Sequence, residues 1–454
     1  MKNASNTSTP HSGATQGPPA ELWDAPVAER PVDATVSVPG SKSLTNRYLV
    51  LAAIADSPSL LRSPLRSRDS GLMITALRAL GARIEELPAE GSSGSGPDLR
   101  ITPIPAGHQA GDVTIDCGLA GTVMRFVPPL AALVPGRIRF DGDEHARLRP
   151  MAGLLDGLRA LGIQVEPAAD GVQEQALPFL LEAEGTVRGG RITIDASASS
   201  QFVSALLLAA PRFERGIHLE HRGAGLPSPE HIAMTVKVLR DAGAEVDDST
   251  PGHWIVQPAK LPGFDIRSEP DLSNAGPFLA AALVSGGRVR ITDWPETTTQ
   301  IGDSWQKILT DFGAEVSLVA GVLEVRGGNR IRGVDLADTS ELAPTVAALC
   351  ALADSPSRLR GIGHLRGHET DRLAALVTEI NRLGGDAEET PDGLIIRPRR
   401  LHGGVFRSYA DHRMATAGAI IGLAVPGVQV ENIATTAKTM PDFPCLWQQM
   451  LGSE

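Results

Sequence analysis

The chain has 454 residues, of which 42% are hydrophobic and 21% charged, as in globular proteins large enough for two domains with separate cores. Its formal net charge of -11 argues against nucleic acid as the main partner, because a phosphate backbone binds to positive surfaces. The sequence has neither an apolar run of about 20 residues nor a CxxC motif, which excludes a membrane span and a zinc ribbon, and we expect a cytoplasmic protein.

Residues 1–24 are rich in Ser, Thr, Gly and Pro and are predicted to form a disordered tail. Beyond this segment, one pattern recurs along the chain: a helix that ends at a glycine and is followed by a strand. Glycine readily takes the left-handed conformation that ends many helices, so each of these glycines is predicted to be a helix C-cap. They are Gly81, Gly162, Gly243, Gly313 and Gly384.

A second pattern alternates with the first and consists of an Ala- and Leu-rich helix, a short turn and a strand. It occurs in six segments, residues 44–63, 122–140, 201–220, 274–292, 344–361 and 413–431. Two interleaved patterns that keep the same order indicate an internal repeat. The sequence therefore predicts six related α/β subunits, three in each half of the chain.

Basic residues stand at the starts of the predicted helices in both halves. Ser, Thr and Asp at helix starts are explained by ordinary N-capping. Lys and Arg are not, because a cation opposes the positive end of the helix dipole. If the subunits share an orientation, these starts converge on a positive cleft that suits a ligand with several negative charges. The basic residues concerned are Lys42, Arg125, Arg149, Arg372, Arg413 and Lys438.

Residues 368–372, with the sequence HETDR, are the most informative of these helix starts. They place His368, Glu369 and Arg372 together at the beginning of an apolar-periodic helix. A helix N-terminus binds anions, an Arg side chain can hold a carboxylate or phosphate with two hydrogen bonds, and a Glu can transfer a proton. Taken alone, the segment could equally be a solvated helix cap.

Other motifs also leave two interpretations open. Lys42 follows Gly40-Ser41 without the upstream glycine of a P-loop, so it is either an anion contact or a surface turn residue. Gly121 could approach a ligand closely or simply begin a helix. Glu341 precedes an apolar helix and could be a cap or a base. Asp411-His412-Arg413 has no second His or Cys at metal-ligand spacing, so we interpret Arg413 as an anion clamp.

Taken together, the motifs resemble those of the EPSP synthase (3-phosphoshikimate 1-carboxyvinyltransferase) family, from about residue 36 to residue 444. The matching motifs are PGSKSLTNR, AGTVMR, SSQF, HETDR, DHRM and AKTMPDF. The resemblance implies a two-domain inside-out α/β barrel with three βαβαββ repeats in each domain. Residues 25–40 plus 270–454 would form one discontinuous domain, and residues 41–269 would form the other.

The implied reaction belongs to the shikimate pathway of aromatic amino-acid biosynthesis. It transfers the enolpyruvyl group of phosphoenolpyruvate to the 5-hydroxyl of shikimate-3-phosphate and releases phosphate. Both substrates are small anions, and family members need no metal or organic cofactor. We expect a monomer without nucleic-acid or membrane partners, and a target of glyphosate, which competes with phosphoenolpyruvate in many family members.

The resemblance also implies a role for each matching residue. Glu341 matches the base that takes the 5-hydroxyl proton, and Lys42 and Glu369 match groups that handle the proton at the phosphoenolpyruvate methylene. The residues that match the phosphoenolpyruvate site are Lys42, Gly121, Arg149, Gln201, Arg372, Arg413 and Lys438. Those that match the shikimate-3-phosphate site are Lys42, Ser43, Arg47, Ser199, Ser200, Gln201, Ser228, Glu341 and His368.

The chain departs from the family pattern at four positions: Glu341 replaces an Asp, His368 a Lys, Leu119 an Asn and His231 a Tyr. Two other functions remain open. The sister enzyme, UDP-N-acetylglucosamine enolpyruvyltransferase, usually has a reactive cysteine in the loop that residues 142–148 match, and these residues contain none. A non-catalytic repeat protein that binds anions would not need carboxylates such as Glu341 within a basic cleft.

Overall fold

The structure is a computed structural model that describes residues 21–88, 97–168 and 175–452. Most of the predicted N-terminal tail, residues 1–20, lies outside the described residues. The prediction is wrong for the end of that segment, where Leu22–Asp24 forms strand β1. This strand pairs antiparallel with β23 (Val428–Glu431) at the edge of a sheet, so its backbone groups are hydrogen-bonded. No local sequence pattern indicates this pairing.

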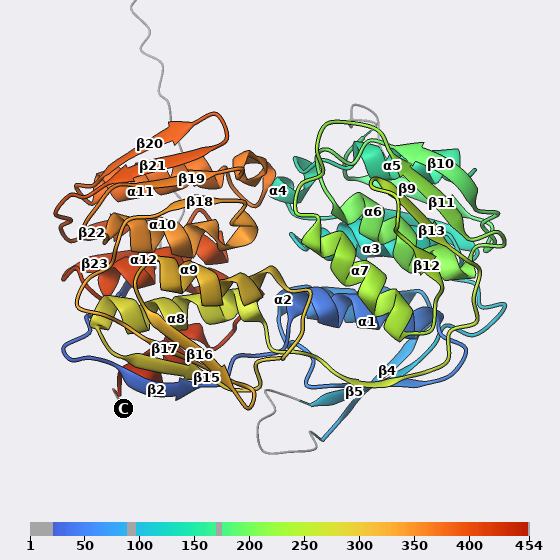
Figure 1. Cartoon of the computed structure of the whole chain (residues 1–454). Helices are drawn as coiled ribbons and strands as arrows, with labels where there is room; N and C mark the ends of the chain where they lie inside the picture. Colours follow the sequence, from blue (N-terminus) through green and yellow to red (C-terminus); the bar gives the residue numbers. More distant parts are fainter. Residues whose placement is uncertain (1–20, 89–96, 169–174, 453–454) are drawn as a thin grey trace, which may run out of the picture.

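Two lobes lie side by side in the molecule (Figure 1). The first contains three four-stranded sheets. In spatial order their strands are β14 (Asp265–Arg267), β3 (Ser59–Arg62), β5 (Asp98–Thr102) and β4 (Arg83–Leu87); β6 (Gly111–Asp116), β7 (Gly136–Asp141), β9 (Phe179–Ala183) and β8 (Gln164–Pro167); and β10 (Gly190–Ile194), β11 (Ile217–His221), β13 (His253–Val256) and β12 (Val246–Asp247).

The second lobe contains two four-stranded sheets and one of three strands. In spatial order their strands are β16 (Glu315–Val319), β17 (Val322–Arg326), β15 (Arg288–Ile291) and β2 (Asp33–Val36); β18 (Asp335–Ala337), β19 (Ser357–Arg360), β21 (Gly393–Arg397) and β20 (Asp386–Thr390); and β1, β23 and β22 (Gly404–Phe406).

Each repeat places one inner and one outer helix between its strands. The inner helices are α1 (Lys42–Ile54), α3 (Gly121–Ala131), α6 (Gln201–Ala209), α8 (Leu272–Ser285), α10 (Ala343–Ala351) and α12 (His412–Gly422). The outer helices are α2 (Arg68–Ala79), α5 (Ala152–Ala160), α7 (Glu230–Asp241), α9 (Trp305–Asp311), α11 (Arg372–Arg382) and α13 (Phe443–Leu451). The short helices are α4 (Glu144–Arg147), η1 (Ala210–Arg212), η2 (Ile301–Ser304), η3 (Ser340–Leu342), η4 (Gly363–Gly367) and η5 (Ile433–Lys438).

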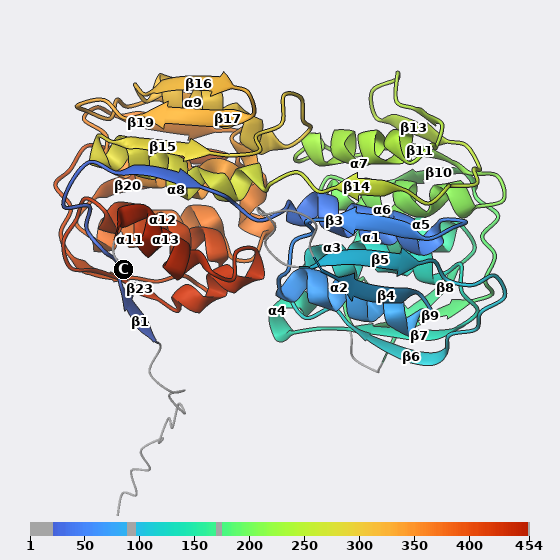
Figure 2. The same ribbon diagram turned by 90° about the horizontal axis from the view of Figure 1, so that it is seen from below.

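The order β6-α3-β7-α5-β8-β9 is one complete βαβαββ unit. Its first two strands are parallel, and its last two form an antiparallel hairpin beside β7. The six predicted repeats are therefore confirmed, with local differences. In two units the first strand comes from a distant part of the chain, beside one of the two crossings between the lobes. Strand β14 pairs with β3 in the first lobe, and β2 pairs with β15 in the second (Figure 2). The last unit has β1 in place of a hairpin.

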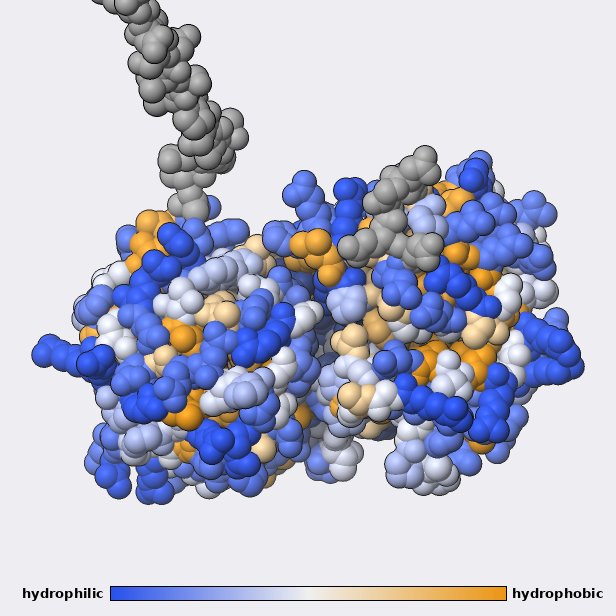
Figure 3. Space-filling view, turned by 90° about the horizontal axis from the view of Figure 1, so that it is seen from above, coloured by the Kyte–Doolittle hydropathy of each residue, from blue (hydrophilic) through white to orange (hydrophobic). Residues whose placement is uncertain are grey.

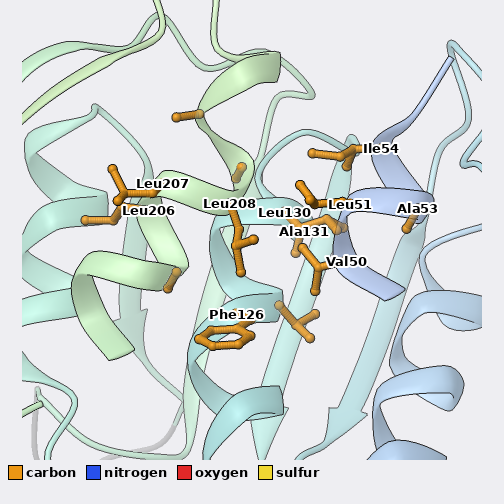
Figure 4. Packing of buried hydrophobic residues seen from close by; sticks show 14 of the residues in the cluster. Val50, Leu51, Ala53, Ile54, Phe126, Leu130, Ala131, Leu206, Leu207 and Leu208 are labelled. Atoms are coloured by element: carbon orange, nitrogen blue, oxygen red, sulfur yellow. The ribbon is translucent and has the colours of Figure 1, made fainter. Parts of the chain in front are cut away.

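The helices α1, α3 and α6 form the centre of the first lobe, with the sheets outside them, and α8, α10 and α12 occupy the same position in the second. These inner helices are buried almost all round, which explains why their sequences are apolar without a polar face. Figure 4 shows Leu51, Phe126 and Leu207, one from each inner helix of the first lobe, in this core. Each such side chain contributes about 1.5–3 kcal/mol when fully buried.

The left-handed conformation predicted for the five glycines at helix ends is confirmed, with φ between 85° at Gly162 and 105° at Gly81, but each glycine directly follows the C-cap residue, as Gly81 follows Leu80. Two separate hydrophobic clusters support the predicted domain boundaries, which stay a prediction. One runs from Leu44 to Leu261, and the other joins residues 25–38 to residues 272–450. The two chain crossings bond to each other at a bridge between Gly40 and Pro270. None of the described helices has the length and apolar character needed to cross a bilayer.

Candidate active site

Helix starts from both lobes surround one pocket, and the six basic residues predicted to stand at helix starts all line it, although Arg125 lies one turn inside α3 and Lys438 is the last residue of η5. The inner helices α1, α3 and α6 begin on one side of it, and α10, α11 and α12 begin on the other. It lies between the lobes, whose mostly hydrophilic surfaces meet along a furrow (Figure 3). The lining residues are Lys42, Ser43, Asp69, Gly121, Thr122, Arg125, Arg149, Ala198, Ser199, Ser200, Gln201, Pro227, Ser228, His231, Glu341, His364, Gly367, His368, Glu369, Arg372, His412, Arg413 and Lys438.

Arg372 is the first residue of α11 and is held by a buried ion pair. Its Nε and Nη2 donate to the two carboxylate oxygens of Asp411 at 2.7 and 3.1 Å. Asp411 is fully buried and also caps α12 by accepting from the backbone N–H of Arg413 at 2.9 Å. Burial lowers the pKa of Arg372, but Asp411 and Glu369 outweigh it and raise the pKa overall. The guanidinium is therefore charged and fixed in orientation.

Glu369 lies among three cationic or basic side chains. Its carboxylate is 2.7 Å from Lys438 Nζ, 3.0 Å from His412 Nδ1 and 3.8 Å from Arg372 Nη2. Burial raises the pKa of Glu369, but Lys438 and His412 outweigh it and hold the pKa well below its usual range. Glu369, Asp411 and His412 are spaced as metal ligands could be. Because Lys438 and Arg372 already neutralise the two carboxylates, we interpret the cluster as a set of ion pairs.

Glu341 lies in the turn η3, immediately before the inner helix α10. Its Oε1 accepts from Ser273 Oγ at 2.6 Å and is 3.0 Å from Arg413 Nη2, while Oε2 is 4.0 Å from His231 Nε2. Burial raises the pKa of Glu341, but Arg413, His231 and Ser273 outweigh it, so the pKa lies below its usual range. The side chain is a carboxylate in a pocket of cations, and it can accept a proton.

The opposite wall of the pocket comes from the first lobe. A Cβ added to Gly121 would lie 2.9 Å from Arg149 Nη2, so the absence of a side chain leaves room for that guanidinium. Arg125 Nη1 donates to Gln201 Oε1 at 2.8 Å. Because the amide oxygen of Gln201 faces Arg125, the NH₂ group of the same amide points away from that guanidinium. Among the described residues, the buried Nε atoms of Arg125 and Arg149 have no hydrogen-bond partner. Buried donors of this kind are uncommon unless a ligand uses them.

Arg47 is the predicted site residue that the structure does not bring into the pocket lining. It lies one turn inside α1, is 1% exposed, and stacks over the Phe126 ring at 5.1 Å. Its Nε donates to Thr235 at 2.8 Å and its other nitrogens donate to the carbonyls of Ser43 and His231. Arg47 thus supports the wall behind Ser43. The sequence pattern could not show this, because it gives a helix position but not the side that faces the ligand.

Asp69 and His364 are among the lining residues that are absent from the predicted site set. Asp69 Oδ2 lies 3.8 Å from Lys42 Nζ, and His364 Nε2 lies 3.4 Å from Ser228 Oγ. The ring centroids of His364 and His368 are 5.7 Å apart. The four-residue spacing of these histidines was the available signal, but His364 lies within the short 3-10 helix η4 and His368 is the C-cap of that helix, so neither stands in an α-helix.

His368, which the resemblance assigns to the shikimate-3-phosphate site, has surroundings that disfavour a charged imidazole. Burial lowers its pKa, and the nearby charges of Arg372 and Arg149 lower it further, to well below the usual value. Arg372 Nη1 lies 3.3 Å from His368 Nδ1, and a guanidinium can only donate, so Nδ1 is the acceptor. The imidazole is therefore neutral in this state of the protein.

Contacts between the lobes surround the pocket. Ser228 Oγ lies 2.8 Å from Ser340 Oγ, and Lys438 Nζ donates to the carbonyl of Leu119 at 3.5 Å. The pocket is therefore assembled from both lobes at once, and each lobe supplies groups that the other lacks.

Comparisons with known proteins agree with this geometry. A family model described as EPSP synthase (3-phosphoshikimate 1-carboxyvinyltransferase) matches residues 27–447. A protein of Kocuria rhizophila named 3-phosphoshikimate 1-carboxyvinyltransferase is 61% identical over 439 residues, 96% of this chain and 97% of that protein. Two solved structures of EPSP synthase from Acinetobacter baumannii have TM-scores of 0.75 and 0.73 at 23% identity, and cover 93% of this chain and 97% and 96% of theirs. At that identity, the solved structures show a shared fold.

Proposed function

The chain belongs to the EPSP synthase family, and we propose that its pocket holds phosphoenolpyruvate and shikimate-3-phosphate next to each other. The enzyme transfers the enolpyruvyl group to the 5-hydroxyl of shikimate-3-phosphate and releases phosphate. The observation that carries the assignment of the pocket is the meeting of basic residues from both lobes around two partly buried carboxylates, Glu341 and Glu369. A positive pocket with built-in bases suits two anionic substrates and a proton transfer.

The phosphoenolpyruvate subsite would lie beside Glu369. Arg149 faces Gly121 on one wall, while Arg372 and Lys438 both contact Glu369 on the other. Guanidinium groups bind phosphate and carboxylate oxygens in pairs, and the fixed orientation of Arg372 reduces the entropy lost on binding. Arg413 and the amide of Gln201, which also line the pocket, complete the predicted set.

The shikimate-3-phosphate subsite would lie between Glu341 and the serines of the first lobe. Ser199, Ser200 and Ser228 line this part of the pocket with hydroxyl groups suited to a phosphate. Lys42 lies at the start of α1, where it can reach both substrates. We retain Arg47 only as a supporting residue, since its nitrogens are engaged by protein groups.

The two carboxylates suit two different proton transfers. In the addition step, Glu341 would take the 5-hydroxyl proton as the oxygen bonds to C2 of phosphoenolpyruvate, and C3 would receive a proton from Lys42. In the elimination step, the C2–phosphate oxygen bond breaks and phosphate leaves while C3 gives a proton back. Glu369 is ionised, because Lys438 and His412 hold its pKa low, so it is suited to take this proton.

Release of phosphate from phosphoenolpyruvate tests the proposed function. We expect release only when shikimate-3-phosphate is also present, because the attacking hydroxyl comes from that substrate. Release with UDP-N-acetylglucosamine instead would identify the sister activity. No release with either acceptor would support a protein that only binds anions. Sedimentation of the same samples would test the monomeric state, which stays a prediction.

The Gly121→Ala variant is expected to weaken binding of phosphoenolpyruvate and to relieve inhibition by glyphosate. The added methyl would lie 2.9–3.0 Å from the two terminal nitrogens of Arg149, so the guanidinium must move. Overpacking of this kind typically costs about 1–3 kcal/mol, or roughly 5–150-fold in affinity. Steady-state kinetics with and without glyphosate would measure the change, and Gly71→Ala is the control, since its Cβ would meet nothing within 4 Å. Equal inhibition of the Gly121→Ala variant and the wild type would contradict the placement of Gly121.

Binding of shikimate-3-phosphate is expected to weaken as pH rises if His368 becomes charged in the complex. The pKa of His368 is low in the free protein and a bound phosphate would raise it, so the complex holds a proton that the free protein lacks. Higher pH removes that proton and lowers affinity. Calorimetric titrations between about pH 5 and 8 would show the slope, and His368→Lys should flatten it. Parallel profiles for the two proteins would mean that the imidazole stays neutral.

A further inference from the structure

Two serines with left-handed backbones meet between the lobes. Ser228, in the loop before α7, has φ of 48°, and Ser340, the first residue of η3, has φ of 47°. Their hydroxyl oxygens are 2.8 Å apart, a hydrogen-bond distance. Ser228 belongs to the first lobe and Ser340 to the second, so the bond forms only when the lobes are together.

The backbone at Ser340 is unusual for its residue type. A non-glycine residue with positive φ is uncommon and costs on the order of 1–3 kcal/mol, so the surrounding structure must hold it. The same short turn contains a second such residue, Asp338, with φ of 56°. Ser340 is buried, and the residue that follows it is Glu341. The strained turn therefore carries the carboxylate that we assign as the base.

The hydroxyl bond lies at the edge of the substrate pocket. Ser228 lines the pocket and its Oγ is also 3.4 Å from His364 Nε2, whereas Ser340 lies outside the lining. A serine hydroxyl has one proton and two acceptor positions. If Ser340 donates to Ser228, the proton of Ser228 remains available for an oxygen of the substrate. One hydroxyl pair can thus join the substrate, the first lobe and the turn of Glu341.

We propose that Ser340 is a positioning residue, which fixes Glu341 in its reactive place through the hydroxyl bond to Ser228 when the lobes close. The inference rests on the proposed function, because it takes Glu341 as the base and Ser228 as a substrate contact. Ser340 itself touches neither substrate. Through Ser340, the position of Glu341 depends on whether the two lobes are closed. The carboxylate is therefore aligned only in the closed enzyme, where the substrate hydroxyl is present.

Two variants separate the hydroxyl from the backbone strain. Ser340→Ala removes the hydroxyl and keeps the strain, while Ser340→Gly removes both, because glycine accepts positive φ. We expect kcat to fall about 10–100-fold in both, since a shift of about 1 Å in a reacting group can cost 10²-fold. KM for phosphoenolpyruvate should change less than about 3-fold, because its subsite lies beside Glu369. Ala320→Gly relieves another left-handed residue, φ 49°, in the β16–β17 turn and should leave kcat unchanged.

A double-mutant cycle tests the contact itself. Ser228→Ala combined with Ser340→Ala should cost clearly less than the product of the two single effects, since both remove the same bond. The proposal would be overturned if the fall in kcat of the double variant equalled the product of the falls in the two single variants. A wild-type kcat in Ser340→Ala would also overturn it. If Ser340→Ala fails to fold, Ser340→Gly, with its relaxed backbone, provides the same test. The proposed function is judged separately, by phosphate release from the wild-type enzyme with both substrates.

Discussion

Glu341→Gln is expected to bind both substrates and to lose turnover by about 10²–10⁴-fold, the usual effect of removing a general base. The amide has nearly the same shape as the carboxylate and can still accept from Ser273, so the pocket should keep its form. It cannot take a proton from the substrate hydroxyl. The expected signature is therefore a low kcat with little change in the affinity for shikimate-3-phosphate.

Single-turnover kinetics and calorimetric binding would measure these two quantities in the same preparation. Glu388→Gln is a matched control, since Glu388 is half exposed and pairs with the partly exposed Arg397 on β21. That control should retain wild-type turnover. Turnover near the wild-type value in Glu341→Gln would show that another group takes the proton.

Asp411→Ala is expected to lower the free energy of unfolding by about 3–5 kcal/mol, because the buried guanidinium of Arg372 loses both of its hydrogen bonds to Asp411 and keeps only the longer contact with Glu369 among its carboxylate partners in the described residues. Arg372 and Asp411 are 2% and 0% exposed, so water cannot replace the lost carboxylate. The substitution also removes the N-cap of α12, where Asp411 accepts from Arg413 N. The variant should lose phosphoenolpyruvate binding as well, since Arg372 is no longer fixed.

Urea denaturation of three variants would test this expectation. Asp411→Asn keeps one oxygen, which can accept from both Arg413 N and Arg372 Nη2, so its loss should be smaller. Asp241→Ala removes an exposed partner of Lys237 on α7 and should cost under about 1 kcal/mol. Similar losses for Asp411→Ala and Asp241→Ala would mean that the buried pair does not stabilise the fold.

The local features of the fold could be predicted from the sequence. Helix periodicity, the C-cap glycines and the apolar inner helices depend on residues close together in the chain, so the six repeats could be recognised. Strand β1 could not, because its partner β23 lies at the other end of the chain and three residues carry no clear pattern. The pairing of β14 with β3 and of β2 with β15 could not be predicted either, because the two strands of each pair are far apart in the chain.

The site was predictable as a set of residues but not as a geometry. The basic residues near helix starts gave six of the lining residues, since a cation at such a position needs an anion to explain it. The sequence could not show that Arg47 faces the wall behind the pocket, or that His364 faces Ser228 of the other lobe. It also could not show that burial, together with two nearby arginines, holds the pKa of His368 low, because both effects depend on the folded structure.

A crystal structure of the enzyme with shikimate-3-phosphate and a non-reacting phosphoenolpyruvate analogue would test the central claim most directly. We predict the phosphate of the first ligand against Ser199, Ser200 and Ser228, with its 5-hydroxyl within hydrogen-bond distance of Glu341. The second ligand should lie between Arg149 and Arg372, near Glu369. Ligands bound elsewhere, or a 5-hydroxyl that faces away from Glu341, would contradict the account.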